Sequence, residues 1–277
     1  MTEPHPGTRR RRVLIALLAA WIAALAGLAW WSVRNDPPTV PEQRTIADAL
    51  PVLQRAAGAL IAASAGDDRA VELGGLRMYR DCSVTPIRRG IEAARTVTVH
   101  VPAGRALPVL KEIAAALPAA FRAEAGSSSG GRRVGLHADA GGFVAIDAAA
   151  DSGTQVFQLE ATTGCRPVDG GVDLNPADPP APSTPPSLRR ALTALGSAGR
   201  PRLREVACPD GGTARTYTVD GVPAPRDLGR SLQPAIDGAT VVRAEPAGWA
   251  YLTGSVSVVV VKDGDALRVS STIACGQ

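Results

Sequence analysis

Residues 94–107 read ARTVTVHVPAGRAL, and residues 214–228 read ARTYTVDGVPAPRDL. Both stretches contain A-R-T-x-T-V followed by V-P-A-x-R-x-L, with one extra residue in the second copy. Each stretch follows a cysteine, Cys82 or Cys208, and each copy closes on the pattern T-x-x-C, at residues 162–165 and 272–275. Because the same features recur in the same order, we interpret them as an internal duplication.

The repeated stretch predicts a strand followed by a helix. In the first copy valines alternate with polar residues, which is typical of a half-buried strand. We therefore expect Val97, Val99 and Val101 to face inward, and the outward set to be Thr96, Thr98 and His100. Pro102 ends the strand. Apolar residues at steps of three and four then predict a helix in each copy, marked by Leu107, Leu110, Ala114, Leu117 and Phe121, and by Leu228, Leu232 and Ile236.

Each copy also contains an opening helix, near Ile46–Ser64 and near Leu188–Leu195, and about three later strands. The strand-like runs are RRVGLHA, GFVAIDA and TQVFQLEAT in the first copy, and ATVVRAE, SVSVVVVKD and ALRVSSTIA in the second. GSSSGG at 126–131 predicts a flexible hairpin loop. The fold class that follows is α+β: two tandem related units, each a mainly antiparallel sheet with helices on one face and each closed by a disulfide.

The apolar run from Val13 to Trp31 is 19 residues long and follows four arginines, Arg9 to Arg12. As a helix it would extend roughly 28 Å, close to the thickness of a hydrocarbon core. Basic residues stay on the cytoplasmic side, so we expect the N-terminus inside and the chain beyond about Arg34 outside. The alternative is a cleavable signal peptide, with a small-residue site at Ala24–Ala26.

These features divide the chain into six expected segments. They are a cytoplasmic tail (1–12), a transmembrane signal anchor (13–33), a Pro-rich spacer (34–43), the first unit (44–166), a Pro-rich linker (167–186) and the second unit (187–277). The linker holds seven prolines and should be partly extended without regular structure. The expected location is the cell membrane, as a single-pass protein with its C-terminal region outside the cytoplasm.

Export favours disulfides, and four cysteines allow three pairings. The duplication selects Cys82 with Cys165 and Cys208 with Cys275, each pair joining the first strand of a unit to its last. The condition is that the Cα atoms of each pair lie within about 7 Å.

The charge argues against nucleic acid as a partner. The chain has a formal net charge of +4, but residues 1–33 hold four of the 30 basic residues and one of the 26 acidic residues. The remainder therefore carries 26 basic and 25 acidic residues and lacks the cationic surface of a nucleic-acid binder.

The sequence singles out few groups for chemistry, and we predict no catalytic, cofactor-binding or metal residues. His137 and Asp139 share a strand face, Ser127–Ser129 lack a nucleophile motif, and the acidic residues of the linker lack regular calcium-ligand spacing (Asp169, Asp173 and Asp178). Trp249 and Tyr251 fall on one face of a strand and form a candidate binding face, with the core side of the sheet as the alternative.

We therefore expect a single-pass membrane protein with a non-catalytic, extracytoplasmic module for binding, sensing or scaffolding. Its expected partners are the lipid bilayer and a membrane or envelope protein. The alternatives are an exported hydrolase and an accessory subunit of an envelope complex.

Overall fold

The structure is a computed structural model of the chain, and it describes residues 6–35, 44–168 and 171–276. Helix α1 (Pro6–Asn35) belongs to the first of two compact units, residues 1–39 and 40–277. Its segment Arg10–Ser32 has 23 residues and a mean hydropathy of 2.4, so it is long and apolar enough to cross a membrane, as signal sequences are too. None of its apolar window is buried. Helix α2 (Ile46–Ser64) also passes this test, but 61% of its apolar window is buried in the globular unit.

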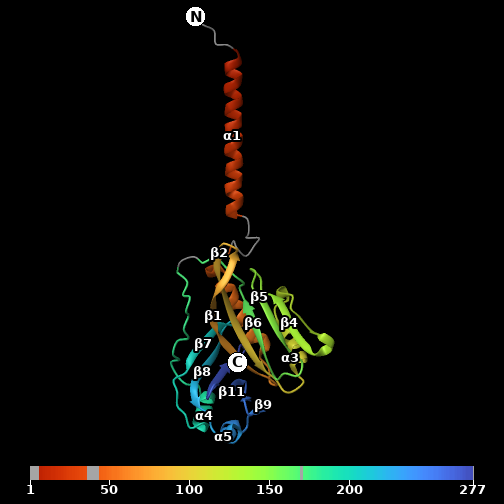
Figure 1. Cartoon of the computed structure of the whole chain (residues 1–277), viewed down its shortest axis with the longest axis vertical. Helices are drawn as coiled ribbons and strands as arrows, with labels where there is room; N and C mark the ends of the chain where they lie inside the picture. Colours follow the sequence, from red (N-terminus) through yellow and green to blue (C-terminus); the bar gives the residue numbers. More distant parts are fainter. Residues whose placement is uncertain (1–5, 36–43, 169–170, 277) are drawn as a thin grey trace. The chain divides into compact units, whose positions relative to one another are not determined.

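The first six-stranded sheet has the order β1-β2-β6-β5-β4-β3, and every neighbouring pair is antiparallel (Figure 1). Its strands are β1 (Ala70–Thr85), β2 (Arg88–His100), β3 (Glu124–Ser128), β4 (Arg133–Asp139), β5 (Ala145–Asp151) and β6 (Val156–Thr162). Helices α2 and α3 (Ala106–Ala116) bury their apolar residues against one face of this sheet.

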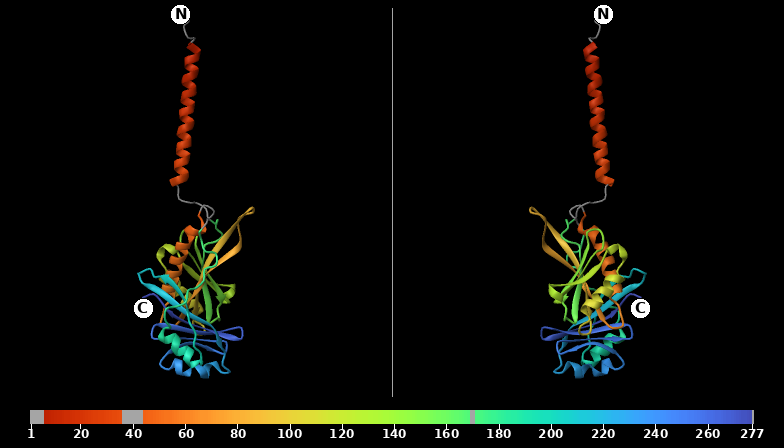
Figure 2. Two further views of the ribbon diagram at one scale, coloured as in Figure 1. Left: turned by 90° about the vertical axis from the view of Figure 1, so that its left-hand side faces the viewer. Right: turned by 90° about the vertical axis from the view of Figure 1, so that its right-hand side faces the viewer.

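The second six-stranded sheet has the order β7-β8-β12-β11-β10-β9, which repeats the topology of the first. Its strands are β7 (Arg202–Ala207), β8 (Thr213–Pro223), β9 (Thr240–Glu245), β10 (Gly248–Thr253), β11 (Val256–Asp263) and β12 (Ala266–Ile273). Helices α4 (Pro186–Ala194) and α5 (Leu228–Ile236) cover one face of it. The strands of this sheet run across those of the first sheet (Figure 2).

Local sequence explains where the helices begin. The Thr45 side chain accepts a hydrogen bond from the Asp48 backbone N–H, and the Asp48 carboxylate accepts one from the Thr45 N–H, which makes a capping box for α2. Helix α4 begins at Pro186, a favourable residue for a first turn because its missing N–H would have no helical partner there. Asp227 caps α5 through the backbone N–H of Arg230 at 2.9 Å.

The predicted order of elements is confirmed except that four strands, not three, follow the middle helix of each copy. The missing strand of the first copy is β3, which takes up residues 126–128 of the expected GSSSGG loop, while Ser129–Gly131 form a 3₁₀ turn with Gly130 at φ 67°. The additional strand of the second copy is β10, which was not among the three strand-like runs, although Trp249 and Tyr251 were expected to share a strand face. The expected linker is not wholly without regular structure, because Pro179–Ala181 pairs in an extended conformation with the edge of β7.

Both predicted disulfides are confirmed. Cys82 is bonded to Cys165 with a Cα–Cα distance of 5.8 Å, and Cys208 is bonded to Cys275 with a distance of 5.6 Å. In each copy the bond joins the first strand, or the residue after it, to the residues after the last strand. Each bond thus ties together the ends of two strands that lie on either side of β2 or of β8 in the strand order.

The two sheets meet at β1, which is an edge strand of the first sheet. This strand lies on the face of the second sheet that α4 and α5 do not cover. The backbone N–H of Val71 donates to Ser257 Oγ at 3.0 Å, and that of Leu73 donates to Thr216 Oγ1 at 3.1 Å. An edge strand presents unpaired N–H groups, and burying them without acceptors would be costly. The hydroxyl groups of the second sheet supply those acceptors and so allow the edge to be buried.

Candidate functional site

Trp249 and Tyr251 lie on the same face of β10, but their surroundings differ. Tyr251 is 1% exposed and belongs to the core between the second sheet and helices α4 and α5. Burial raises the pKa of its hydroxyl group above the ordinary value. Trp249 is only partly buried and packs over Gly229, where an added Cβ would lie 2.9 Å from the indole ring. Tyr251 is therefore a core residue, and only Trp249 of the candidate binding face can meet a ligand.

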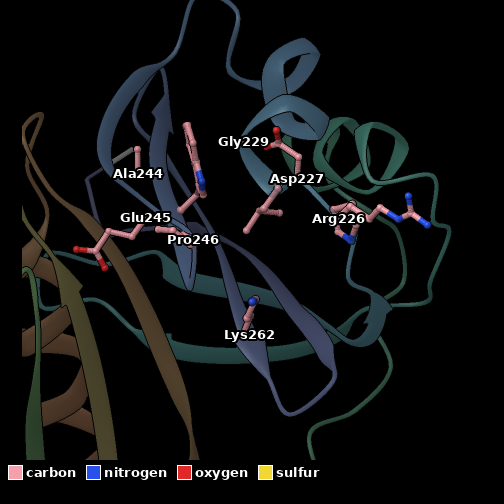
Figure 3. Close-up of a pocket in the computed structure, with 10 residues that line it drawn as sticks. Arg226, Asp227, Gly229, Ala244, Glu245, Pro246 and Lys262 are labelled. Atoms are coloured by element: carbon pink, nitrogen blue, oxygen red, sulfur yellow. The ribbon is translucent and has the colours of Figure 1, made fainter.

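Trp249 lines a pocket of about 380 Å³ between the start of α5, the β9–β10 turn and β11. This volume lies within the usual range for small-molecule sites. The pocket is lined by Pro225, Arg226, Asp227, Leu228, Gly229, Ala244, Glu245, Pro246, Trp249 and Lys262. Figure 3 shows Lys262 rising from β11 toward the middle of this group, with Arg226 and Glu245 on opposite sides.

The acidic residues of the pocket are already engaged. Asp227 caps α5 and lies 3.7 Å from the Arg230 guanidinium. Glu245 accepts a hydrogen bond from Gln155 at 2.7 Å through one carboxylate oxygen and from Arg243 at 2.5 Å through the other. The carboxylate of Glu245 therefore fixes the β9–β10 turn to the first sheet through Gln155.

The cations of the pocket are not engaged in the same way. Within the described part of the chain, neither Arg226 nor Lys262 forms an ion pair. The wall formed by Trp249, Pro225 and Pro246 is apolar. The pocket therefore combines an apolar wall with two available positive charges, and none of the described serine, cysteine or histidine side chains lines it.

The outward set of the repeated strand is not solvated as predicted. Thr96 is 7% exposed and His100 is 2% exposed, because this face of the first sheet turns toward the second sheet. Burial, with the positive charges of Arg243 and Arg268, lowers the pKa of His100 to about 3, so its imidazole is neutral. Neither ring nitrogen has a hydrogen-bond partner among the described residues. The predicted alternation is confirmed, since Val97, Val99 and Val101 are buried. The sequence did not predict that the second sheet covers the opposite face of the strand.

A second polar pocket of about 210 Å³ opens beside this contact. Its inner wall carries Glu72, whose carboxylate lies 3.6 Å from Arg268 and 4.0 Å from Arg204. Burial raises the pKa of Glu72 more than the two arginines lower it. Arg204 is also bound to Asp178 at 2.6 Å, so the positive charges here are largely paired.

The remaining candidate residues do not come together. His137 Nδ1 lies 2.8 Å from the carboxylate of Asp147 on β5, while Asp139 accepts a hydrogen bond from the backbone N–H of Gly141 at 2.8 Å. His137 therefore pairs with Asp147 and not with Asp139, which shares its strand face, and both partners of the observed pair are exposed. Ser127 and Ser128 lie in β3, and Ser129 begins a 3₁₀ turn.

Of the acidic linker residues, Asp178 pairs with Arg204, Asp173 accepts from the Asn175 N–H at 2.8 Å, and Asp169 lies outside the described residues. Across residues 6–35, 44–168 and 171–276, no group of three or more His, Cys, Asp or Glu side chains is arranged to hold a metal ion.

Sequence reasoning found Trp249 but missed Arg226 and Lys262, because the pocket joins three segments that lie far apart along the chain. Comparison of the chain with protein-family models, curated proteins and solved structures found no match.

Proposed function

We propose that the chain is a single-pass membrane protein that carries a non-catalytic binding module outside the cytoplasm. Two features support the membrane part. The apolar helical segment Arg10–Ser32 begins within a run of four arginines, Arg9 to Arg12, and two disulfides favour an oxidising compartment. We further propose that the two disulfide-closed sheets are tandem α+β units that arose by duplication.

The observation that carries the binding role is the Trp249 pocket. An aromatic wall with Arg226 and Lys262 beside it suits a ligand that has an apolar ring or chain and an anionic group. The acids cannot repel such a ligand strongly, since Asp227 and Glu245 are engaged by cationic or amide partners. We therefore propose small organic anions, with carboxylates as the simplest class.

The binding proposal can be tested with the fluorescence of Trp249 itself. The other tryptophans, Trp21, Trp30 and Trp31, all lie in α1, so their replacement by Phe leaves Trp249 as the only indole. In this background the full chain in detergent should respond to benzoate but not to benzylamine. Hydrogen bonds to charged groups contribute about 1.5–3 kcal/mol, so Lys262→Gln should weaken benzoate binding about tenfold or more.

The chain contains a matched control, because its other lysine, Lys111, is exposed on α3, outside the pocket. Lys111→Gln should leave benzoate binding unchanged. Equal responses to benzoate and benzylamine, or equal losses in the two lysine variants, would exclude the anion site.

The topology proposal has a separate test. Protease added to intact cells should remove an unstructured tag fused after Gln277, while a tag placed before Met1 should survive until the cells are opened. A protected C-terminal tag on cells with a demonstrably accessible surface would exclude the proposed orientation. Free protein in the medium beginning near Gly27 would indicate a cleaved signal peptide.

A further inference from the structure

The hairpin of β1 and β2 is longer than its counterpart in the second sheet. Its pairing continues past Cys82, which lies opposite Gly90, to Thr85 opposite Arg88. In the second sheet the pairing of β7 with β8 stops at Ala207, before Cys208. The β1–β2 hairpin therefore projects beyond the strands beside it, as the orange and yellow strands show in Figure 2.

The tip of this hairpin is apolar and cationic. Ile87 is 98% exposed, more than any other large apolar side chain among the described residues. Arg88 and Arg89 beside it are also exposed and form no ion pair within the described part of the chain. The turn between β7 and β8 instead reads PDGG (209–212) and has neither a large apolar side chain nor a basic one. An exposed apolar residue flanked by arginines is the chemistry that suits an anionic lipid surface.

The hairpin tip lies at the end of the globular unit where the chain arrives from α1. The N–H of Ile46, the first residue of α2, donates to the carbonyl of Pro167 at 3.0 Å. The neighbouring Arg166 exchanges backbone hydrogen bonds with Ile91 of β2, at 2.8 and 2.9 Å. Ile91 lies four residues from Ile87, so the beginning of α2 and the base of the hairpin share one end of the unit.

The connection to the apolar helix is short. The candidate span ends at Ser32 and the N-cap of α2 is Thr45, so twelve residues separate them. A fully extended chain of this length reaches at most about 40 Å. A tether of this reach holds the hairpin at a high effective concentration near the membrane surface, so a weak contact suffices for docking.

We propose that the tip of the β1–β2 hairpin docks on anionic lipid headgroups at the outer surface of the bilayer, with Ile87 entering the interface and Arg88 and Arg89 meeting phosphates. This inference rests on the proposed membrane-spanning role of α1. Docking at this site limits the rotation of the globular unit about its tether and so fixes which surfaces face away from the membrane.

The test uses the full chain in nanodiscs of phosphatidylcholine and phosphatidylglycerol in equal parts, with a nitroxide on the lipid headgroups. A dye is attached through Pro86→Cys at the exposed hairpin tip, or through Ser255→Cys in the exposed β10–β11 turn, which has no arginine beside it. Peptide mapping without reductant first establishes that both native disulfides remain. The dye at residue 255 is the control, because its quenching reports how strongly the dye itself binds lipid without the arginines of the hairpin tip.

Docking predicts that the nitroxide quenches the dye at residue 86 several-fold more than the dye at residue 255. Each arginine near an anionic surface contributes about fivefold to binding, so Arg88→Gln with Arg89→Gln should reduce the ratio of docked to free hairpin about 25-fold. Ile87→Ser should also reduce the quenching. High salt and nanodiscs of pure phosphatidylcholine should have the effect of the arginine changes.

Two negative results have different meanings. One result is that the chain enters nanodiscs but the two dyes are quenched equally, or that quenching at residue 86 does not change with the lipid charge. This result overturns the docking inference and leaves the spanning role of α1 in place. If the chain does not enter nanodiscs, both proposals fail. Quenching that appears only with another protein added to the nanodiscs would overturn lipid docking in favour of a protein partner.

Discussion

The two sheets share a strand order, but equivalent residues of the repeated strand have different surroundings. His100 is 2% exposed, whereas the side chain of Asp220, its counterpart, is 35% exposed and binds Arg202 at 2.7 Å. Arg95 is buried and its counterpart Arg215 lies at the surface. The repeated sequence thus produces one topology twice, while the contact between the sheets is asymmetric: the first residues of β1 are buried against the second sheet, and the linker pairs with the edge of β7.

The asymmetry extends to the cores. Helix α2 packs on the first sheet, yet its cluster also includes Val206, Ala214 and Ala274 of the second sheet. Gly58 of α2 approaches so closely that an added Cβ would lie 2.0 Å from the carbonyl oxygen of Ala207. Helices α4 and α5 contribute their buried residues only to the core of the second sheet. The first copy therefore depends on the second for part of its own core.

The largest expected effects come from removing the disulfides. They close loops of 83 and 67 residues, so the chain-entropy model assigns each about 4.5 kcal/mol of stability, with a difference of only about 0.2 kcal/mol between them. Cys208 and Cys275 also pack against the cluster that contains α2. We expect Cys208→Ser with Cys275→Ser to cost more than Cys82→Ser with Cys165→Ser in urea denaturation of the full chain in mild detergent.

Peptide mapping without reductant provides the control, because each double variant must retain the other native bond. A larger loss on replacing Cys82 and Cys165 than on replacing Cys208 and Cys275 would contradict the asymmetry between the cores. Losses below about 1 kcal/mol in both pairs would show that loop closure contributes little here.

The second prediction concerns the close approach of α2 to the second sheet. Gly58→Ala should destabilise the fold by about 2–3 kcal/mol, because the methyl group collides with backbone that cannot rotate away. The preference of helices for alanine acts in the opposite direction and is already included in this estimate. Thermal and urea denaturation of the full chain measure the change.

Gly126→Ala is the matched control. Gly126 lies in β3, and an added Cβ would meet nothing within 4 Å. That variant should be neutral or slightly stabilising. If Gly58→Ala is equally harmless, α2 does not bind the second sheet as closely as the structure indicates.

The sequence predicted what depends on local pattern and missed what depends on contacts between distant segments. Alternation marked the valines of β2, and the repeat selected the disulfide partners because equivalent cysteines occupy equivalent ends of a sheet. Strand β3 was missed because Gly126, Ser127 and Ser128 carry no apolar alternation and pair only through their backbone. Lys262 was missed because its pocket forms only after three separate segments fold together.

His100 provides the most informative miss and the third prediction. The strand face that carries His100 was expected to be solvated, because the local sequence pattern does not predict that β1 and β2 contact another sheet. Once buried, the imidazole stays neutral in the folded state down to a pKa of about 3, whereas in the unfolded chain it gains a proton below about pH 6.5. Its contribution to stability is therefore complete above pH 6.5 and is lost as the pH falls from 6.5 toward 3.

His100→Leu removes this dependence, so the wild type should lose about 1.6 kcal/mol more than the variant between pH 6.5 and pH 5, measured by urea denaturation at each pH. The comparison of the two proteins cancels the titration of Glu72 and the other carboxylates, which both contain.

Asp220→Asn changes the equivalent residue of the second copy. Its exposed pair with Arg202 contributes at most about 1 kcal/mol, so this variant should change stability little at either pH. A His100→Leu variant whose stability followed that of the wild type down to pH 5 would mean that water reaches His100. The two copies would then have similar outer faces, and the asymmetry between them would be confined to their cores.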